Sequence, residues 1–71
     1  MSRTPEQWEE ARQEAITMRR LLRQVEAIAF DWPSNFDETA EHARDIVEMT
    51  ERTIDKTNEM IGMLTHDFDD A

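Results

Sequence analysis

The sequence contains no cysteine and no tyrosine, and it has only one glycine and two prolines among its 71 residues. The absence of cysteine excludes a disulfide framework, a thiolate zinc site and a thiol nucleophile. Few glycines and prolines, together with 35% charged and 38% hydrophobic residues, favour long helices over strands and turns. A chain this short buries only about 60% of its unfolded surface as one domain, which leaves little room for a deep catalytic cleft.

The charge is one-sided, with 17 acidic and 8 basic side chains and a formal net charge of −9. Residues 1–30 hold five acids and five bases, whereas residues 31–71 hold twelve acids and three bases. Nucleic acids and anionic membranes need a basic surface, so we expect neither as a direct partner and expect any charged partner to be basic. The longest apolar run, residues 27–30, is far shorter than the roughly 18–20 residues of a bilayer span. No signal-like block lies in residues 1–20, and we therefore expect a cytoplasmic protein.

The first helix is predicted over about residues 5–31. Its start signal is a capping box, in which Thr4 is the N-cap, Pro5 the first helical residue and Gln7 the third. Apolar or small residues then recur at alternating spacings of three and four, a heptad seam formed by Trp8, Ala11, Ala15, Met18, Leu22, Val25, Ala29 and Trp32. Leu21 and Ile28 widen this seam on one flank. Pro33 cannot continue a helix, and we predict a turn over residues 31–35.

The second helix is predicted over about residues 35–65, with Ser34 as its N-cap. Its seam continues the same spacing through Phe36, Ala40, Ala43, Val47, Thr50, Ile54, Thr57, Ile61, Leu64 and Phe68, and Ile46, Thr53 and Met60 widen it. The acidic tail, residues 66–71, is expected to lie outside the helix because negative charge opposes the dipole at a helix C-terminus.

These patterns predict a single all-α domain, an antiparallel helical hairpin with heptad seams. A turn at Pro33 would set Leu22 opposite Val47. Each seam is three positions wide per heptad, which is wider than a two-stranded contact needs, so we expect a second copy to complete a four-helix bundle. The residues expected in the core or the dimer interface are Trp8, Met18, Leu22, Val25, Ile46, Val47, Ile54, Met60, Ile61 and Leu64.

An acidic series follows the outer face of the second helix at helical spacing: Glu38, Glu41, Asp45, Glu48, Asp55 and Glu59. One interpretation is the solvated back of a coiled-coil helix. The other is an acidic ridge that imitates a phosphate track and binds the basic surface of another protein. Phe30 and Trp32, beside the turn, either seal the end of the bundle or add to a partner-binding site. Four arginines, Arg12, Arg19, Arg20 and Arg23, are expected to pair with acids such as Glu9 or Glu26, or alternatively to dock a second subunit.

Neither histidine carries a recognisable catalytic or metal motif. Thr39 and Met63 stand three residues before His42 and His66, so the Glu-x-x-His motif of di-iron bundles is absent. Glu38 with His42, or the acidic tail with His66, is at most a weak site for a divalent ion, and surface solvation is the alternative. Without a cysteine, a tyrosine or a serine paired to a base, we expect no catalytic residue, no metal and no cofactor.

The sequence therefore favours a non-enzymatic protein–protein interaction module. Its most concrete form is a small acidic inhibitor or adaptor, encoded by a phage or mobile element, that binds a basic protein surface and also pairs with itself. Two alternatives stay open: a purely structural, self-assembling helical subunit, and a weakly metal-binding helical bundle.

Overall fold

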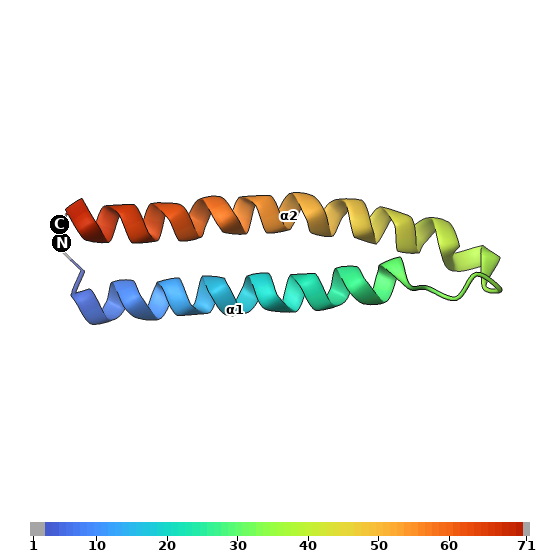
Figure 1. Ribbon diagram of the computed structural model, residues 1–71, viewed down its shortest axis with the longest axis horizontal. Helices are drawn as coiled ribbons and strands as arrows, with labels where there is room; N and C mark the ends of the chain where they lie inside the picture. Colours follow the sequence, from blue (N-terminus) through green and yellow to red (C-terminus); the bar gives the residue numbers. More distant parts are fainter. Residues whose placement is uncertain (1–2, 71) are drawn as a thin grey trace.

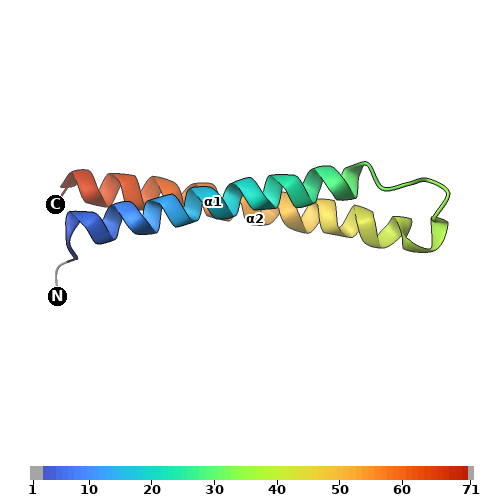
Figure 2. The ribbon, with the colours of Figure 1, turned by 90° about the horizontal axis from the view of Figure 1, so that it is seen from below.

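The chain folds into two long antiparallel helices joined by a short connection (Figures 1 and 2). This computed structural model describes the backbone of residues 3–70 and the side chains of residues 3–65. Helix α1 spans Pro5–Phe30 and helix α2 spans Asp37–Asp70. The start of α1 and the end of α2 lie at the same end of a rod with extents of 53 × 17 × 15 Å. The predicted all-helical hairpin is confirmed.

The start of α1 matches its sequence signal. The backbone N–H of Gln7 donates a hydrogen bond to Thr4 Oγ1 at 3.1 Å, and the backbone N–H of Thr4 donates to Gln7 Oε1 at 2.9 Å. Both halves of the capping box are therefore present, with Pro5 at the first helical position. The Arg3 guanidinium lies over the Trp8 ring at 5.3 Å from its centroid, a cation–π contact.

The connection between the helices is longer than the sequence predicted. Helix α2 begins at Asp37 and not near Asn35, so the prediction of Ser34 as its N-cap is wrong. The backbone N–H of Phe36 donates to the Pro33 carbonyl at 3.2 Å. This hydrogen bond closes a separate turn before the helix, and that turn delays the first helical residue by about two positions.

The other end of α2 also differs from the prediction. The helix continues to Asp70, so the end predicted near residue 65 is wrong by five residues. No proline or glycine follows Gly62 to stop the helix, and an unfavourable charge near the dipole costs only about 0.3–1 kcal/mol. Backbone hydrogen bonding therefore outweighs the acidic composition of this segment.

The register of the two helices follows from the turn. Ala29 and Ala43 line the same two grooves between the helices, and the Trp32 indole N–H donates to Thr39 Oγ1 at 2.8 Å. Because the helices are antiparallel, seven residues before Ala29 on α1 and seven residues after Ala43 on α2 lie at the same level, which places Leu22 level with Thr50. This register differs by about three residues from the predicted pairing of Leu22 with Val47.

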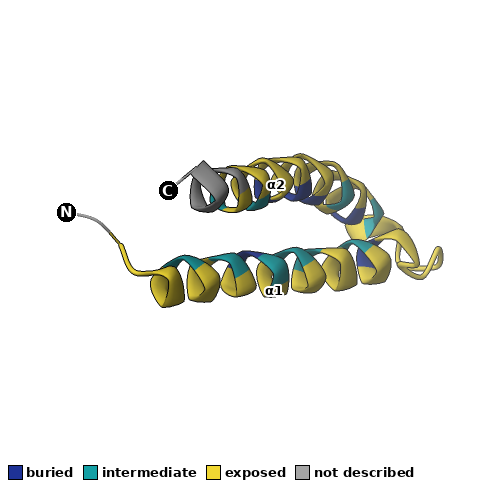
Figure 3. Cartoon of the chain, turned by 60° about the vertical axis from the view of Figure 1, so that its left-hand side comes forward, coloured by how far each residue is buried: buried dark blue, intermediate teal, exposed yellow. Residues whose placement is uncertain are grey.

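The core between the helices consists mainly of small side chains. Among residues 3–65, the buried ones are Ala15, Ala29, Ala43, Thr50, Ile54 and Thr57. Figure 3 shows that the buried and half-buried positions of both helices face each other. The hydroxyls of Thr50 and Thr57 donate to the carbonyls of the residues four before them, Ile46 and Thr53, so neither buried hydroxyl lacks a partner.

The face that α1 turns to α2 differs from its predicted seam. Met18, Val25 and Ala11 are exposed, whereas Arg12, Arg19 and Glu26 occupy half-buried positions. Met18 and Val25, which the seam predicted to be covered by α2, therefore stay 44% and 46% exposed in the single chain. Long arginine stems can lie along a seam while their charged heads reach its rim, and this allows them to take positions that hydropathy assigns to apolar residues.

Candidate functional surfaces

An apolar groove lies between the helices near the turn. It has a volume of about 440 Å³. Its walls come from both sides of the hairpin: Val25, Ile28, Ala29, Trp32, Thr39, His42, Ala43 and Ile46. The groove exists because Ala29 and Ala43 are small residues at the same level of the seam. The hydrogen bond from Trp32 to Thr39 holds the indole ring at the end of this groove.

The groove is one end of a longer apolar surface. Residues seven apart lie on the same side of a helix, so Met18 and Leu21 continue the side of Val25 and Ile28. On α2 the same spacing continues Ile46 to Met60 and His42 to Met49 and Met63. We call this surface the apolar face; its large exposed residues are Met18, Leu21, Val25, Ile28, Trp32, Ile46, Met49, Met60 and Met63.

The other residues predicted for the core or interface lie between the helices. Ile54 is buried, and five more are half-buried: Trp8, Leu22, Val47, Ile61 and Leu64. The remaining four, Met18, Val25, Ile46 and Met60, all belong to the apolar face. The single chain therefore divides the predicted set into an inner part and an outer part.

The acidic residues predicted to bind a partner are all exposed on α2. Ile54 and Thr57 face α1, and helical geometry places Glu41, Glu48 and Glu59 on the side that points away from it. We call this surface the acidic ridge; it consists of Glu38, Glu41, Asp45, Glu48, Asp55 and Glu59. Within the part of the chain whose side chains are described, none of these carboxylates forms an ion pair.

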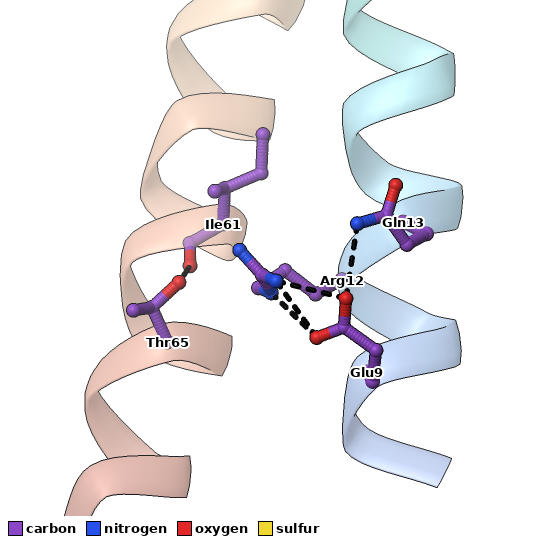
Figure 4. A network of polar contacts seen from close by, with 5 residues as sticks. All are labelled: Glu9, Arg12, Gln13, Ile61 and Thr65. Atoms are coloured by element: carbon purple, nitrogen blue, oxygen red, sulfur yellow. Dashed lines mark hydrogen bonds and ion pairs between the residues drawn. The ribbon is translucent and has the colours of Figure 1, made fainter. Parts of the chain in front are cut away.

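The arginine cluster makes only some of its expected contacts. Arg12 donates hydrogen bonds of 2.7, 2.9 and 3.1 Å to the Glu9 carboxylate, as predicted for that pair. Figure 4 shows Arg12 between the helices, close to the turn of α2 that contains Ile61. The Arg12 guanidinium and then the Gln13 amide lower the pKa of Glu9, because both donate hydrogen bonds to its charged form.

A second arginine joins the two helices. Arg19 Nη1 donates to Asn58 Oδ1 at 2.7 Å, although the sequence predicted acidic partners for this cluster. Arg23 lines a shallow polar groove on the same side of the hairpin, together with Glu26, Glu51, Asp55 and Asn58. This polar side lies opposite the apolar face. The heptad pattern alone does not predict the Arg19–Asn58 contact, because the contact also depends on how α1 and α2 are aligned along the rod.

The aromatic residues beside the turn are divided between these two sides. Trp32 lines the apolar groove, whereas Phe30 is 78% exposed and lies in a shallow groove with Arg44, Val47 and Glu48. Phe36 is exposed in the connection. The two residues predicted to bind a partner, Phe30 and Trp32, therefore both line this second, shallow groove, and Trp32 also lines the apolar groove.

The histidine and metal predictions gain no support among residues 3–65. His42 lies at the groove, and no three histidine, aspartate or glutamate side chains of these residues come close enough to hold a metal ion. The second weak candidate, His66 with the acidic tail, falls outside the described side chains. In the described residues, neither helix contains an apolar stretch long enough to span a bilayer.

Comparisons of this chain with protein families, with curated proteins and with solved structures find no match.

Proposed function

We propose that this chain is a non-enzymatic protein-interaction module. Two copies pair through their apolar faces into a homodimeric four-helix bundle, and the acidic ridge of each copy binds a basic protein surface. One observation carries this proposal: the two surfaces lie on different sides of the hairpin. Both helices contribute to the apolar face, whereas the ridge lies on the side of α2 that points away from α1. A second copy on the apolar face thus leaves the ridge exposed.

The distribution of side-chain sizes supports self-association. Small alanine and threonine side chains fill most of the buried core, while nine large hydrophobic residues are exposed on one face. The rod measures 53 by 17 Å along its two longer axes, so its broad side has a projected area of roughly 900 Å², of the same order as the ~800 Å² that each partner buries in standard interfaces. At about 25 cal/mol per Å² of apolar area, covering even a quarter of this area with apolar contacts is comparable with the whole stability of a small domain.

The ridge supports binding to a basic partner. Acidic residues three or four positions apart on a helix have Cβ atoms about 5–6 Å apart, near the spacing of phosphates along a nucleic-acid strand. A protein groove that neutralises phosphates with arginine and lysine would meet a similar charge pattern here. In this role the chain is a cytoplasmic inhibitor or adaptor that occupies a nucleic-acid-binding surface in place of the nucleic acid.

Charge reversal on the ridge tests this role. The test variant combines Glu41→Lys with Glu48→Lys, and the control combines Glu10→Lys with Asp31→Lys, an equal charge change at exposed residues outside the ridge. An immobilised linker histone serves as the basic probe, with duplex DNA as competitor. We expect the unmodified chain to bind with an affinity that falls as salt rises and to compete with DNA. The ridge variant should bind at least tenfold more weakly than the control. Equal losses in the two variants would show that net charge alone determines binding.

A purely structural subunit is the second candidate, because the apolar face supports self-pairing whether or not the ridge has a partner. In that case the ridge variant would still form dimers, and the unmodified chain would neither bind the basic probe nor displace DNA from it.

A further inference from the structure

Residues of the two helices lie level with one another across the apolar face. Ile28 and His42 line the same groove, as do Val25 and Ile46. Because the helices are antiparallel, adding seven to the α2 residue and subtracting seven from the α1 residue gives the next pair at one level along the rod. The further pairs that result are Leu21 with Met49, Met18 with Thr53, Glu14 with Lys56, and Ala11 with Met60. Apart from the Glu14–Lys56 level, the exposed side chains at these levels are uncharged.

A second copy can cover this face in two symmetric ways. If the two-fold axis runs along the rod, both turns lie at the same end, and α1 of each copy packs on α2 of the other. If the axis runs across the rod, the turns lie at opposite ends, and each helix packs on its own counterpart. Closed two-fold dimers allow both arrangements, so the side chains must decide between them.

The hydrophobic pattern favours turns at the same end. In that arrangement each level of α1 meets the same level of the second copy's α2, and Leu21 contacts Met49 as Val25 contacts Ile46. With turns at opposite ends and the two rods overlapping over their full length, the apolar half of α1 would lie against the polar half of the other α1. Leu21 would then meet Glu14, and Ile28 would meet Gln7, so polar groups would be buried without partners.

The charges favour the same arrangement. Residues 37–65 of α2 carry eight acids and three bases, a net charge of −5, whereas α1 carries five acids and four bases, a net charge of −1. Turns at opposite ends would pack two helices of charge −5 against each other, while turns at the same end pair each with a nearly neutral helix. The one charged level then sets Glu14 beside Lys56 of the second copy, which are opposite in sign.

We infer that the partner of the apolar face is a second copy of this chain docked with its turn at the same end, α1 against α2. This inference rests on the proposed self-association and adds its orientation and register. One consequence is that Trp32 and Phe36 of both copies gather at a single end of the bundle. Another is that the two acidic ridges lie at diagonally opposite corners, each of them open.

A spin label in the turn measures this orientation directly. Because the chain has no cysteine, Ser34→Cys provides a single attachment point, and it lies in the exposed connection, away from the apolar face. Pulsed electron–electron double resonance should give a distance below about 30 Å between the labels of the two copies, since neighbouring helix axes lie 8–10 Å apart. Labels separated by nearly the 53 Å length of the rod would overturn the inference.

Cross-linking provides a second readout that also tests the register. Leu21→Cys and Met49→Cys are prepared as separate chains, mixed and oxidised, and the products are identified by mass. We expect a mixed disulfide dimer, with far less product from either variant alone. Met18→Cys lies near the middle of α1 and is the matched control, because it would link to itself only with turns at opposite ends.

The outcomes separate this inference from the function on which it rests. A single-chain mass in light scattering would refute self-association itself. A doubled mass, combined with Met18→Cys self-linking or with no mixed Leu21–Met49 disulfide, would leave the dimer in place and refute the proposed orientation.

Discussion

Replacing two side chains of the apolar face should dissociate the dimer without unfolding the hairpin. Leu21 is 55% exposed and Ile28 is 65% exposed in the single chain, so changing both to glutamine removes little of the packing between α1 and α2. Glutamine also favours helices about as well as leucine does. Fully burying such a side chain contributes about 1.5–3 kcal/mol, and roughly half of each remains to be covered. Two residues in each of two copies therefore contribute about 4 kcal/mol, which corresponds to a roughly thousandfold weaker dimer.

Sedimentation equilibrium over a dilution series measures this loss, and circular dichroism shows whether the helices remain. The matched control is Phe30→Gln, because Phe30 is even more exposed, at 78%, but lies on the polar side of the hairpin. We expect the control to keep the dissociation constant of the unmodified chain. An unchanged constant in the Leu21 and Ile28 variant would refute the assignment of the interface, as would an equal loss in the control.

Three further predictions test individual parts of the structure. Changing Ile54, which is 7% exposed, to aspartate buries an unpaired charge and should abolish the cooperative thermal transition followed by circular dichroism; an unchanged melting temperature would contradict its place in the core. Thr4→Ala removes one half of the capping box and should cost about 1 kcal/mol in chemical unfolding, whereas Thr4→Ser should restore it. Arg12→Gln removes the main cause of the lowered Glu9 pKa, so this pKa should rise in an NMR titration. A carboxyl group whose pKa is lowered in the folded state stabilises the fold at pH values above its ordinary pKa, and this stabilisation is lost as the pH falls through the lowered pKa. The stability of the variant should therefore depend less on pH in that range.

The sequence predicted the buried stripe of α2 better than that of α1 for a physical reason. Every seam position of α2 between residues 40 and 64 holds an alanine, valine, threonine, isoleucine or leucine, so the heptad spacing identifies the buried stripe. In α1 the seam instead contains Arg12, Arg19 and Glu26, whose long stems pack while their polar ends stay at the rim. A hydropathy pattern assigns such positions to solvent and places Met18 and Val25 inward.

The two candidate surfaces also differ in how well the sequence predicts them. The acidic ridge was identifiable from spacing, because charged residues on the outer side of a helix need no tertiary contact to be placed. The apolar groove was not, because it depends on Ala29 and Ala43 standing at one level, and the connection between the helices is one residue longer than the sequence predicted. The backbone hydrogen bond from Phe36 to Pro33 closes a turn within this connection.

One hairpin leaves its own large hydrophobic residues exposed, and we propose that a second copy covers them. Sedimentation equilibrium of the unmodified chain, at micromolar concentration and neutral pH, measures this directly. We expect twice the 8.4 kDa mass of the chain. A mass of 8.4 kDa that stays constant as the concentration rises would refute self-association.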